Sequence, residues 1–259
     1  MIKSLHNSAA GINAQQSRID TTSNNIVGIN VDSYKAQRLS FADMVYAKMA
    51  DAGRPVVAPP GERPLHGAGV RQIANLRDFI QGSIRETGRK TDLAIDGRGF
   101  FKVILPDGSE AYTRNGNFNL NANRELVNDD GYKLFPGITL PAGSQGLSVD
   151  KYGNLSVTEG DGQNSEVGSI PIYNFVNPNG LKALGKNLFS VSEEAGPEEE
   201  GTPGQEGFGA VIQGALESSN VDLAVEMTNL LEAQRIYQLN ARSLKTSDDM
   251  WGMANNLRK

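Results

Sequence analysis

The side chains that could perform chemistry are few and widely separated in this sequence. It has no cysteine, and its two histidines, His6 and His66, have no second histidine at the spacing of a metal-binding pair. The missing cysteine excludes thiolate catalysis, zinc–thiolate sites and disulfide bonds. Two isolated histidines provide little material for a metal centre or a catalytic triad. We therefore interpret both histidines as surface or packing residues.

Two short motifs that resemble binding loops have simpler explanations. The run DGRGFFKV contains Gly97 and Gly99 but lacks the third glycine and the following helix of a dinucleotide-binding loop, so it is typical of a turn before a strand. The acidic run from Glu198 to Glu200 lies in the breaker-rich stretch GPEEEGTPGQEG, which indicates a solvated loop. Neither motif predicts a cofactor site.

The aspartates offer one catalytic alternative. Asp129 and Asp130 are adjacent, so their side chains diverge on a strand, and an aspartate before Gly131 is ordinary turn chemistry. A hydrolase that used these carboxylates together with Asp150 is the enzyme hypothesis that the sequence leaves open. We expect no catalytic, cofactor-binding or metal-binding residue.

Composition favours a chain with protein partners. The 259 residues carry a net charge of -5, with a pI of about 5.2, so no broad basic field exists to hold nucleic acid or an anionic membrane. No run approaches the roughly 20 apolar residues of a membrane span. The first residues, MIKSLHNSAAGINAQQ, are polar where a signal peptide is apolar. These standard signals alone predict a cytoplasmic protein.

A long amphipathic helix is predicted at the N-terminus. From Ile2 to Ile26, positions spaced alternately by three and four residues are mostly apolar, which is typical of a coiled-coil seam. The seam positions are Ile2, Leu5, Ala9, Ile12, Gln16, Ile19, Ser23 and Ile26.

A second such helix is predicted from about Val221 to Leu257, with Asn220 as its N-cap. Its seam positions are Leu223, Met227, Leu230, Gln234, Tyr237, Ala241, Leu244, Asp248 and Trp251. A lone seam leaves its apolar stripe in water, although burial of each large aliphatic side chain contributes roughly 1.5 to 3 kcal/mol. The two seams could pair within one chain or pack on neighbouring copies, and composition does not decide between these alternatives.

The segment after the first helix is expected to contain a short second helix and then a loop. From Ser40, the residues Phe41, Met44, Val45 and Met49 fall on one helical face. Residues 50–69 are rich in proline and glycine, which neither a helix nor a central strand tolerates. Its prolines, Pro55, Pro59, Pro60 and Pro64, predict a preorganised strap, with an ordinary surface loop as the alternative.

The central part of the chain is predicted to be rich in β-strands. Short β-branched and aromatic segments are separated by turn pairs such as Asp107-Gly108, Asp130-Gly131 and Gly153-Asn154. We expect an α+β fold in which N- and C-terminal helices form a coiled-coil-like assembly core around an inserted β-rich domain. The expected parts are residues 1–49 (the helix and short second helix), 50–69 (the strap loop), 70–195 (the β-rich domain), 196–220 (a loop and return segment) and 221–259 (the C-terminal helix).

Several long motifs then point to one family. The stretches SNNIVGINVDSYK, GFFKVILPDGSEAYTRNGNFNLNANRELVNDDGYKL and GTPGQEGFGAVIQGALESSNVDLAVEMTNLLEAQRIYQLNARSLKTSDDM occur in this order. Their order and spacing over nearly the whole chain resemble the flagellar rod and hook family. The chain departs from the usual family pattern at Val27-Gly28 and at Ser33-Tyr34-Lys35, where the aromatic residue is tyrosine rather than phenylalanine.

The resemblance implies a structural role without a cofactor. It implies that the terminal helices pack together and against other subunits as the inner tube of a hollow helical filament that transmits torque. The self-assembly residues would be Ile2, Leu5, Ile12, Ile19, Ile26, Leu223, Met227, Leu230, Tyr237 and Leu244. The continuous match from Gln81 to Pro136, the phrase GSIPIYNFVNPNGLKALGKNLF and the proline-rich stretch favour the distal part of the rod.

The family's partners and route are implied in the same way. They are further copies of the chain, proximal rod proteins, hook protein, the rings around the rod and the flagellar export apparatus, with no nucleic acid. The destination would be the periplasmic rod of the basal body, reached without a cleaved signal peptide. A proximal rod protein, the wall hydrolase and an extracellular adhesin with a coiled-coil base are the alternatives.

Overall fold

The computed structural model describes residues 2–44, 47–48, 65–66, 69–141, 146–158 and 164–256. The strap prolines, Pro55, Pro59, Pro60 and Pro64, lie outside the described residues, and so does the strap prediction. The chain divides into two compact units. Unit 1 comprises Met1–Val27, Gln37–Arg77 and Asp222–Lys259, and unit 2 comprises Gly28–Ala36 and Asp78–Val221.

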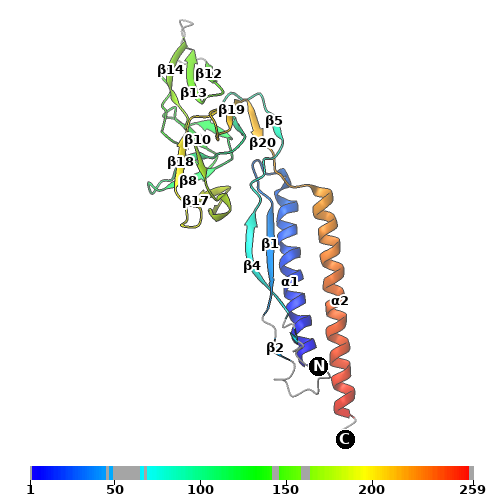
Figure 1. The fold of residues 1–259 in the computed structure, drawn as a ribbon. Helices are drawn as coiled ribbons and strands as arrows, with labels where there is room; N and C mark the ends of the chain where they lie inside the picture. The colour runs from blue at the N-terminus through cyan, green and yellow to red at the C-terminus, as the bar shows by residue number, and fades with distance from the viewer. Residues whose placement is uncertain are drawn as a thin grey trace. The chain divides into compact units, whose positions relative to one another are not determined.

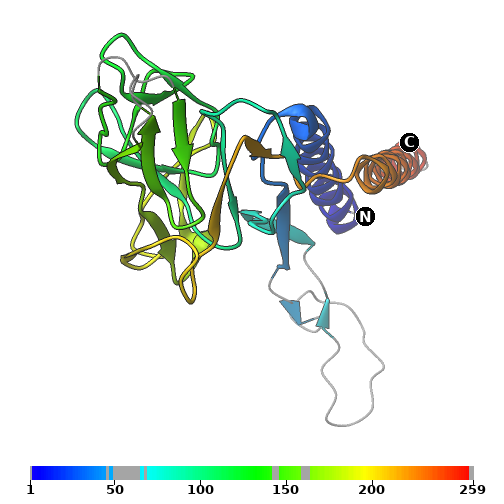
Figure 2. The same ribbon diagram turned by 90° about the horizontal axis from the view of Figure 1, so that it is seen from above.

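Unit 1 consists of two long helices and a narrow β-ribbon. Helix α1 spans Ile2–Val27 and helix α2 spans Leu223–Asn256, and the two lie side by side (Figures 1 and 2). Strand β1 (Gln37–Asp43) pairs antiparallel with β4 (Val70–Arg77), and both strands contact α1. Strand β2 (Ala47–Lys48) pairs with β3 (Leu65–His66). The prediction of two terminal helices is confirmed.

The predicted short second helix is wrong from Ser40 to Asp43, since these residues form part of a strand, while Val45 and Met49 lie outside the described residues. Strand β1 pairs with β4 from Gln37 opposite Arg77 to Asp43 opposite Val70, with a β-bulge between Ser40 and Phe41. The helical pattern of Phe41 and Met44 covers only about one turn, whereas the partner strand β4 satisfies the backbone N–H and C=O groups of these residues.

The predicted N-cap of α2 is also wrong by two residues. The Asp222 carboxylate accepts hydrogen bonds from the backbone N–H groups of Ala224 and Val225, at 2.8 and 3.2 Å. Asp222 therefore satisfies two of the amide groups that a helix leaves free at its first turn. The side chain of Asn220 bonds to other segments.

Unit 2 is built from antiparallel strands. The largest sheet has the order β16-β17-β8-β7-β11-β10-β9, a second has the order β12-β13-β14, and three pairs are β15 with β18, β19 with β6, and β20 with β5. Among the described residues, short 3-10 helices cover Gly28–Asn30 and Pro178–Gly180. The strands are β5 (Ile84–Glu86), β6 (Leu93–Asp96), β7 (Phe101–Ile104), β8 (Glu110–Thr113), β9 (Phe118–Leu120), β10 (Leu126–Asn128), β11 (Lys133–Leu134), β12 (Gly146–Val149), β13 (Asn154–Thr158), β14 (Asn164–Ser169), β15 (Ile172–Phe175), β16 (Lys182–Gly185), β17 (Leu188–Ser190), β18 (Glu198–Gly201), β19 (Ala210–Gln213) and β20 (Ala215–Glu217).

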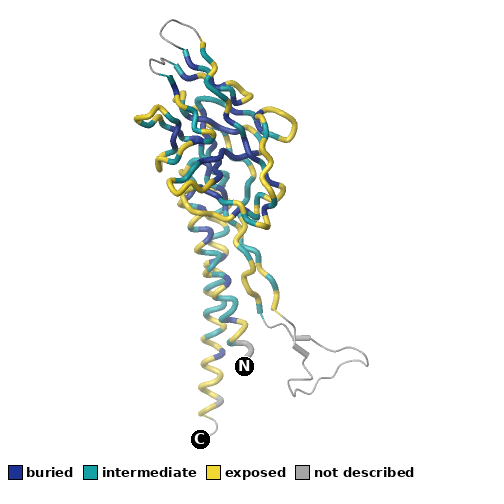
Figure 3. Tube along the Cα trace, turned by 90° about the vertical axis from the view of Figure 1, so that its left-hand side faces the viewer, coloured by how far each residue is buried: buried dark blue, intermediate teal, exposed yellow. Residues whose placement is uncertain are grey.

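Two apolar clusters form the core of unit 2. Figure 3 shows the buried residues concentrated in this part of the chain. The larger cluster includes Phe101, Val103, Phe118 and Leu155, and the smaller one is mainly aromatic. The turns predicted at Asp107-Gly108, Asp130-Gly131 and Gly153-Asn154 are confirmed, since they lie between β7 and β8, β10 and β11, and β12 and β13. The prediction of a β-rich insertion is therefore confirmed.

The acidic run is exposed, as predicted, but it forms a strand rather than a loop. Glu198–Gly201 forms β18, which pairs with β15, and the Glu198 carboxylate contacts Lys102 Nζ at 3.1 Å and accepts a hydrogen bond from the Tyr112 hydroxyl. The buried Lys102 ammonium group and the Tyr112 hydroxyl need a polar partner, and the Glu198 carboxylate provides one. The expected loop and return segment, residues 196–220, contains three strands and belongs to unit 2, whereas β4 belongs to unit 1.

Candidate assembly surface

The two helices of unit 1 meet along a polar face. They run antiparallel, since residues early in α1 contact residues late in α2. The hydrogen-bonded or ion-paired side chains are Ser8 with Ser243 at 3.4 Å, Arg18 with Glu232 at 2.9 Å, and Asn25 with Glu226 at 3.2 Å. Gly11 lies so close to Asn240 that an added Cβ atom would be 2.7 Å from its Nδ2. Small and polar residues therefore contribute to the contact between the two helices.

Few apolar side chains are fully buried in the described part of unit 1. Among its described residues, the only apolar ones that are fully buried are Ala14 and Ala233. Its other buried residues are polar, namely Ser8, Thr21, Thr22, Asn25 and Ser247. Since stabilisation by burial scales with apolar area, two alanines contribute little compared with the clusters of unit 2.

Large apolar side chains of unit 1 instead face the outside of the chain. Met227 is 52% exposed and Leu239 is 62% exposed. The exposed large apolar residues of α2 are Leu223, Val225, Met227, Leu231, Leu239, Met250, Trp251 and Met253, and those of the ribbon and its flanks are Phe41, Met44, Val70, Ile73 and Leu76. Apolar surface gathered on one element in this way is typical of an interaction surface.

The predicted α1 seam is partly covered within the chain. Leu5, Ile12, Ile19 and Ile26 are half-buried, and the side chain of Ile2 lies outside the described ones. On α2, the predicted residues Leu230, Tyr237 and Leu244 are half-buried, whereas Leu223 and Met227 are exposed. The structure therefore brings some predicted residues toward the helix pair and leaves others exposed.

The predicted apolar seam of α2 only partly matches the side of this helix that is covered within the chain. The least exposed line of this helix runs through Glu226, Leu230, Ala233, Tyr237, Asn240, Leu244 and Ser247. It has the same alternating spacing of three and four residues as the predicted seam and shares three positions with it. The positions outside the predicted seam are Glu226, which bonds to Asn25 of α1, the small residues Ala233 and Ser247, and Asn240, which lies against Gly11 of α1.

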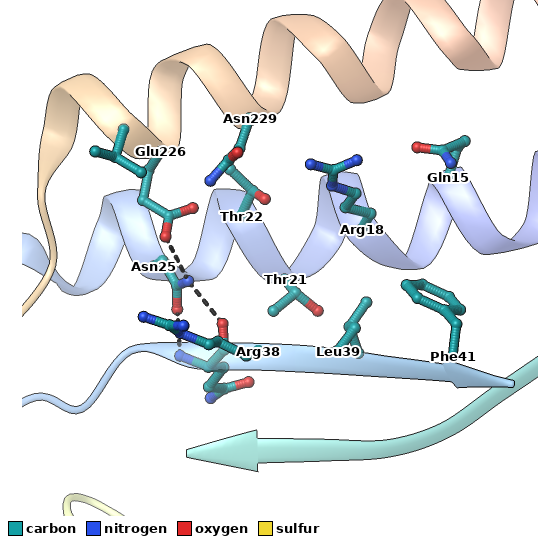
Figure 4. Close-up of a pocket in the computed structure, with 12 residues that line it drawn as sticks. Gln15, Arg18, Thr21, Thr22, Asn25, Arg38, Leu39, Phe41, Glu226 and Asn229 are labelled. Carbon is teal, nitrogen blue, oxygen red and sulfur yellow. Dashed lines mark hydrogen bonds between the residues drawn. The ribbon is translucent and has the colours of Figure 1, made fainter. Parts of the chain in front are cut away.

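A polar groove of about 520 Å³ opens between α1, α2 and β1 (Figure 4). Asn25 forms its best-defined corner, because its side chain accepts a hydrogen bond from Gln37 N at 2.8 Å and donates to Gln37 O at 2.9 Å. The groove is lined by Gln15, Arg18, Thr21, Thr22, Asn25, Gln37, Arg38, Leu39, Phe41, Val225, Glu226 and Asn229. These side chains offer hydrogen bonds but no nucleophile paired with a base.

The carboxylates of the enzyme hypothesis have structural roles. Asp129 accepts hydrogen bonds from two asparagine side chains, at 2.8 and 3.1 Å. Asp130 forms an ion pair with Lys186 at 2.6 Å. Asp150 accepts hydrogen bonds from the backbone amides of its own turn. Each carboxylate stabilises a local turn or strand contact.

Neither a metal centre nor a membrane span emerges from the described part of the chain. His6 is exposed, and the described residues contain no group of three or more histidines, aspartates and glutamates that could hold a metal ion. Within the same residues, no helix combines the length and the apolar character needed to cross a bilayer.

Comparison with known proteins finds similarity along the whole chain. Residues 94–157 match the model of the flagellar hook protein FlgE/F/G D1 domain, and residues 212–257 match that of the flagellar basal body rod FlgEFG protein C-terminal region. The flagellar basal-body rod protein FlgG of Borreliella burgdorferi is 41% identical, with both chains covered completely. The chain belongs to the FlgG family of flagellar basal-body rod proteins.

Other members of the rod family are similarly close. FlgG of Caulobacter vibrioides is 37% identical over 99% of this chain and 100% of the relative, and FlgG of Bacillus subtilis is 35% identical over the full length of both. Rod proteins are structural, and this chain is a structural subunit of the basal-body rod rather than an enzyme. The hypothesis of a wall hydrolase is therefore wrong.

Proposed function

We propose that unit 1 is the assembly module of this rod subunit and that its apolar face packs on neighbouring copies. The observation that carries the proposal is the contrast inside unit 1. Its fully buried apolar side chains are two alanines among the described residues, while eight large apolar side chains of α2 are exposed. A module with this distribution gains most of its apolar burial only when neighbours cover it.

Assembly of this kind would give a filament. Contacts between different surfaces of identical subunits repeat without closing when each step adds a rotation and a rise, which generates an open helix. In this proposal, α2 provides Leu223 and Met227, and α1 provides the half-buried Ile12 and Ile19, to adjacent subunits. The product is a hollow shaft in the distal rod that transmits torque from the motor to the hook.

The partners and position of the subunit follow from the family and remain part of the proposal. The relatives are named as basal-body rod proteins, and one further relative, 31% identical, is a hook-basal body complex protein of Bacillus subtilis. We place this chain in the periplasmic rod between proximal rod proteins and hook protein, with the surrounding rings as neighbours and without a cofactor. Delivery uses the flagellar export apparatus without cleavage of a signal peptide. A position in the proximal rod is the alternative.

Met227→Asp tests the assembly surface in a host strain that lacks the native gene. Because Met227 is already exposed, the charge costs the isolated subunit little, but in an assembled rod it would be buried without a partner, which costs several kcal/mol per subunit. We expect a folded and exported subunit that builds no distal rod and restores no motility. Gln238→Asp is the control, since it adds the same charge at an exposed polar position of the same helix.

Two outcomes separate misfolding from failed assembly. Circular dichroism of purified Met227→Asp should match the unchanged chain, and electron microscopy of basal bodies should show short rods. Rods of normal length and normal swimming with Met227→Asp would contradict the proposal.

A further inference from the structure

The chain passes between unit 1 and unit 2 at four points, after Val27, Ala36, Arg77 and Val221. Within unit 2, three segments carry these crossings, namely residues 28–36, 78–83 and 217–221. Such connections are often independent flexible linkers. Here the three segments are bonded to one another.

Glu217 is the first point at which these segments meet. Its buried carboxylate accepts hydrogen bonds from Lys35 Nζ at 2.7 Å and from the backbone N–H of Gly82 at 2.8 Å. Its second oxygen accepts a hydrogen bond from Arg114 Nε at 2.9 Å, and its backbone oxygen accepts one from Ser33 N at 2.7 Å. One residue thus binds both of the other segments.

The ionised form of Glu217 suits this arrangement. Burial alone would raise the pKa of its carboxyl group, but the charges of Arg114 and Lys35 outweigh burial and hold the pKa below its ordinary value. Arg114 also donates hydrogen bonds to the carbonyl oxygens of Gly97 and Gly99, both at 2.9 Å. The carboxylate is thereby anchored to the turn between β6 and β7.

Asn220 is the second point at which the three crossing segments meet. Its Oδ1 atom accepts a hydrogen bond from Ala36 N at 2.8 Å. Its Nδ2 atom donates to the carbonyl oxygens of Asp78 and Ile80, at 2.7 and 3.0 Å. A single amide side chain therefore bridges the same two segments that Glu217 holds. The Ile80 oxygen also accepts a hydrogen bond from Lys35 Nζ at 2.9 Å.

The backbones of the three segments also contact one another directly. Asp78 N donates to Ala36 O, and Ser218 N donates to Ser83 O, both at 2.8 Å. A Cβ atom at Gly82 would lie 2.0 Å from Ser218 O, so only glycine allows these two segments to pass so closely. An ordinary buried polar network could join any neighbouring strands, whereas here the bonds repeatedly join the three crossing segments.

We propose that Glu217 and Asn220 form a clamp that couples the three crossing segments, so that they leave unit 2 as one mechanical connection rather than as separate tethers. A load on any one segment is then shared by the other two. The clamp belongs to the single chain and does not depend on how copies assemble, so it can be tested on the monomer.

Native-state hydrogen exchange of the full chain with Asn220→Ala is the main test. The amides of Ser33, Asp78 and Ser218 do not bond to the Asn220 side chain. If the segments are coupled, these three amides should nevertheless exchange about tenfold faster together with Ala36, because the loss of several hydrogen bonds permits a shared local opening. Acceleration of Ala36 alone would overturn the clamp.

A matched control and a milder variant keep this test decisive. Asn177 also donates a side-chain hydrogen bond within unit 2, to Glu194 O at 3.1 Å, and Asn177→Ala should leave the three amides unchanged. If Asn220→Ala does not fold, Asn220→Asp replaces it, since it keeps the acceptor for Ala36 N and loses the two donated bonds. Asp78 and Ser218 should then exchange faster, and unchanged exchange at both would overturn the clamp.

Distances between spin labels test whether the clamp makes the three segments act as one connection. Because the chain has no cysteine, spin labels can be attached at cysteines introduced at Lys182 in unit 2 and Gln238 in unit 1, both exposed. Asn220→Ala should broaden the distribution of distances between the labels, and Asn177→Ala should not. An unchanged distribution in Asn220→Ala would contradict coupled load transfer.

Discussion

At the scale of single residues, the polar side chains of this protein stabilise structure instead of reacting. Lys102 illustrates this, because its Nζ atom lies 4.4 Å from the centre of the Tyr173 ring and 3.0 and 3.1 Å from the carboxylates of Glu110 and Glu198. Burial opposes the charge of Lys102, but the hydrogen bonds to the two carboxylates outweigh it and raise the pKa of the amine. The cation is held between aromatic rings and acids, where it joins β7, β8 and β18.

The hydroxyl of Tyr173 should titrate unusually late. Burial raises its pKa from 10.0 to about 12, the positive charge of Lys102 opposes this shift, and Glu200 adds to it. Because the folded pKa lies above the unfolded one, the stabilisation is complete below pH 10 and is lost as the pH rises through about 12. Tyrosinate absorbance should show a late step that Tyr173→Phe removes. A late step that survives this substitution would assign it to another tyrosine.

At the scale of elements, the first turn of α2 depends on one side chain. Asp222→Ala should lower the stability of unit 1 by about 1 kcal/mol, because the amides of Ala224 and Val225 lose their acceptor. Asp222→Asn keeps an oxygen at the same place and should cost only about a few tenths of a kcal/mol. The unfolding midpoint of the helical signal in denaturant measures both. Equal losses in the two variants would show that the charge, and not the cap, matters.

Elements that depend on local sequence could be predicted, and those that depend on distant partners could not. Turn pairs such as Asp107-Gly108 select hairpins by themselves, and the terminal helices have long periodic patterns. The residues around Phe41 become a strand only because β4 lies beside them, and Glu198 joins a strand because β15 and Lys102 are near. The sequence around Phe41 and around Glu198 does not indicate which distant strands and side chains will lie beside these residues.

The side of α2 that is covered within the chain could be predicted in part. Leu230, Tyr237 and Leu244 of the predicted seam lie on this side, whereas their role in self-assembly stays a prediction. The seam did not predict that Glu226 and Asn240 share that side, because a count of apolar residues ignores polar positions such as Glu226, which bonds to Asn25, and Asn240, which lies against Gly11. Whether the exposed Met227 contacts another subunit stays a prediction.

At the scale of the whole molecule, the two units differ in how much apolar surface they bury. Unit 2 has two buried apolar clusters, whereas Ala14 and Ala233 are the only fully buried apolar side chains among the described residues of unit 1. The isolated subunit should therefore lose its helical signal at a lower temperature than its β-signal, because packing stabilises most helices in proteins. Circular dichroism during heating measures both signals.

Trp251 gives an independent measure of the same difference. It is the only tryptophan in the sequence and lies on α2 with 41% of its surface exposed, so its fluorescence reports on unit 1 alone. We expect its transition to coincide with the earlier, helical one. A single transition seen by helix, sheet and tryptophan together would show that unit 1 is stable as part of the monomer core.

The central claim is that this chain builds a segment of the flagellar rod, and electron microscopy of basal bodies from a strain lacking its gene tests it most directly. Family membership and the uncovered apolar face of α2 together predict rods that stop short and carry no hook, with full length restored by the unchanged gene. Complete rods with hooks in the strain that lacks the gene would contradict the account.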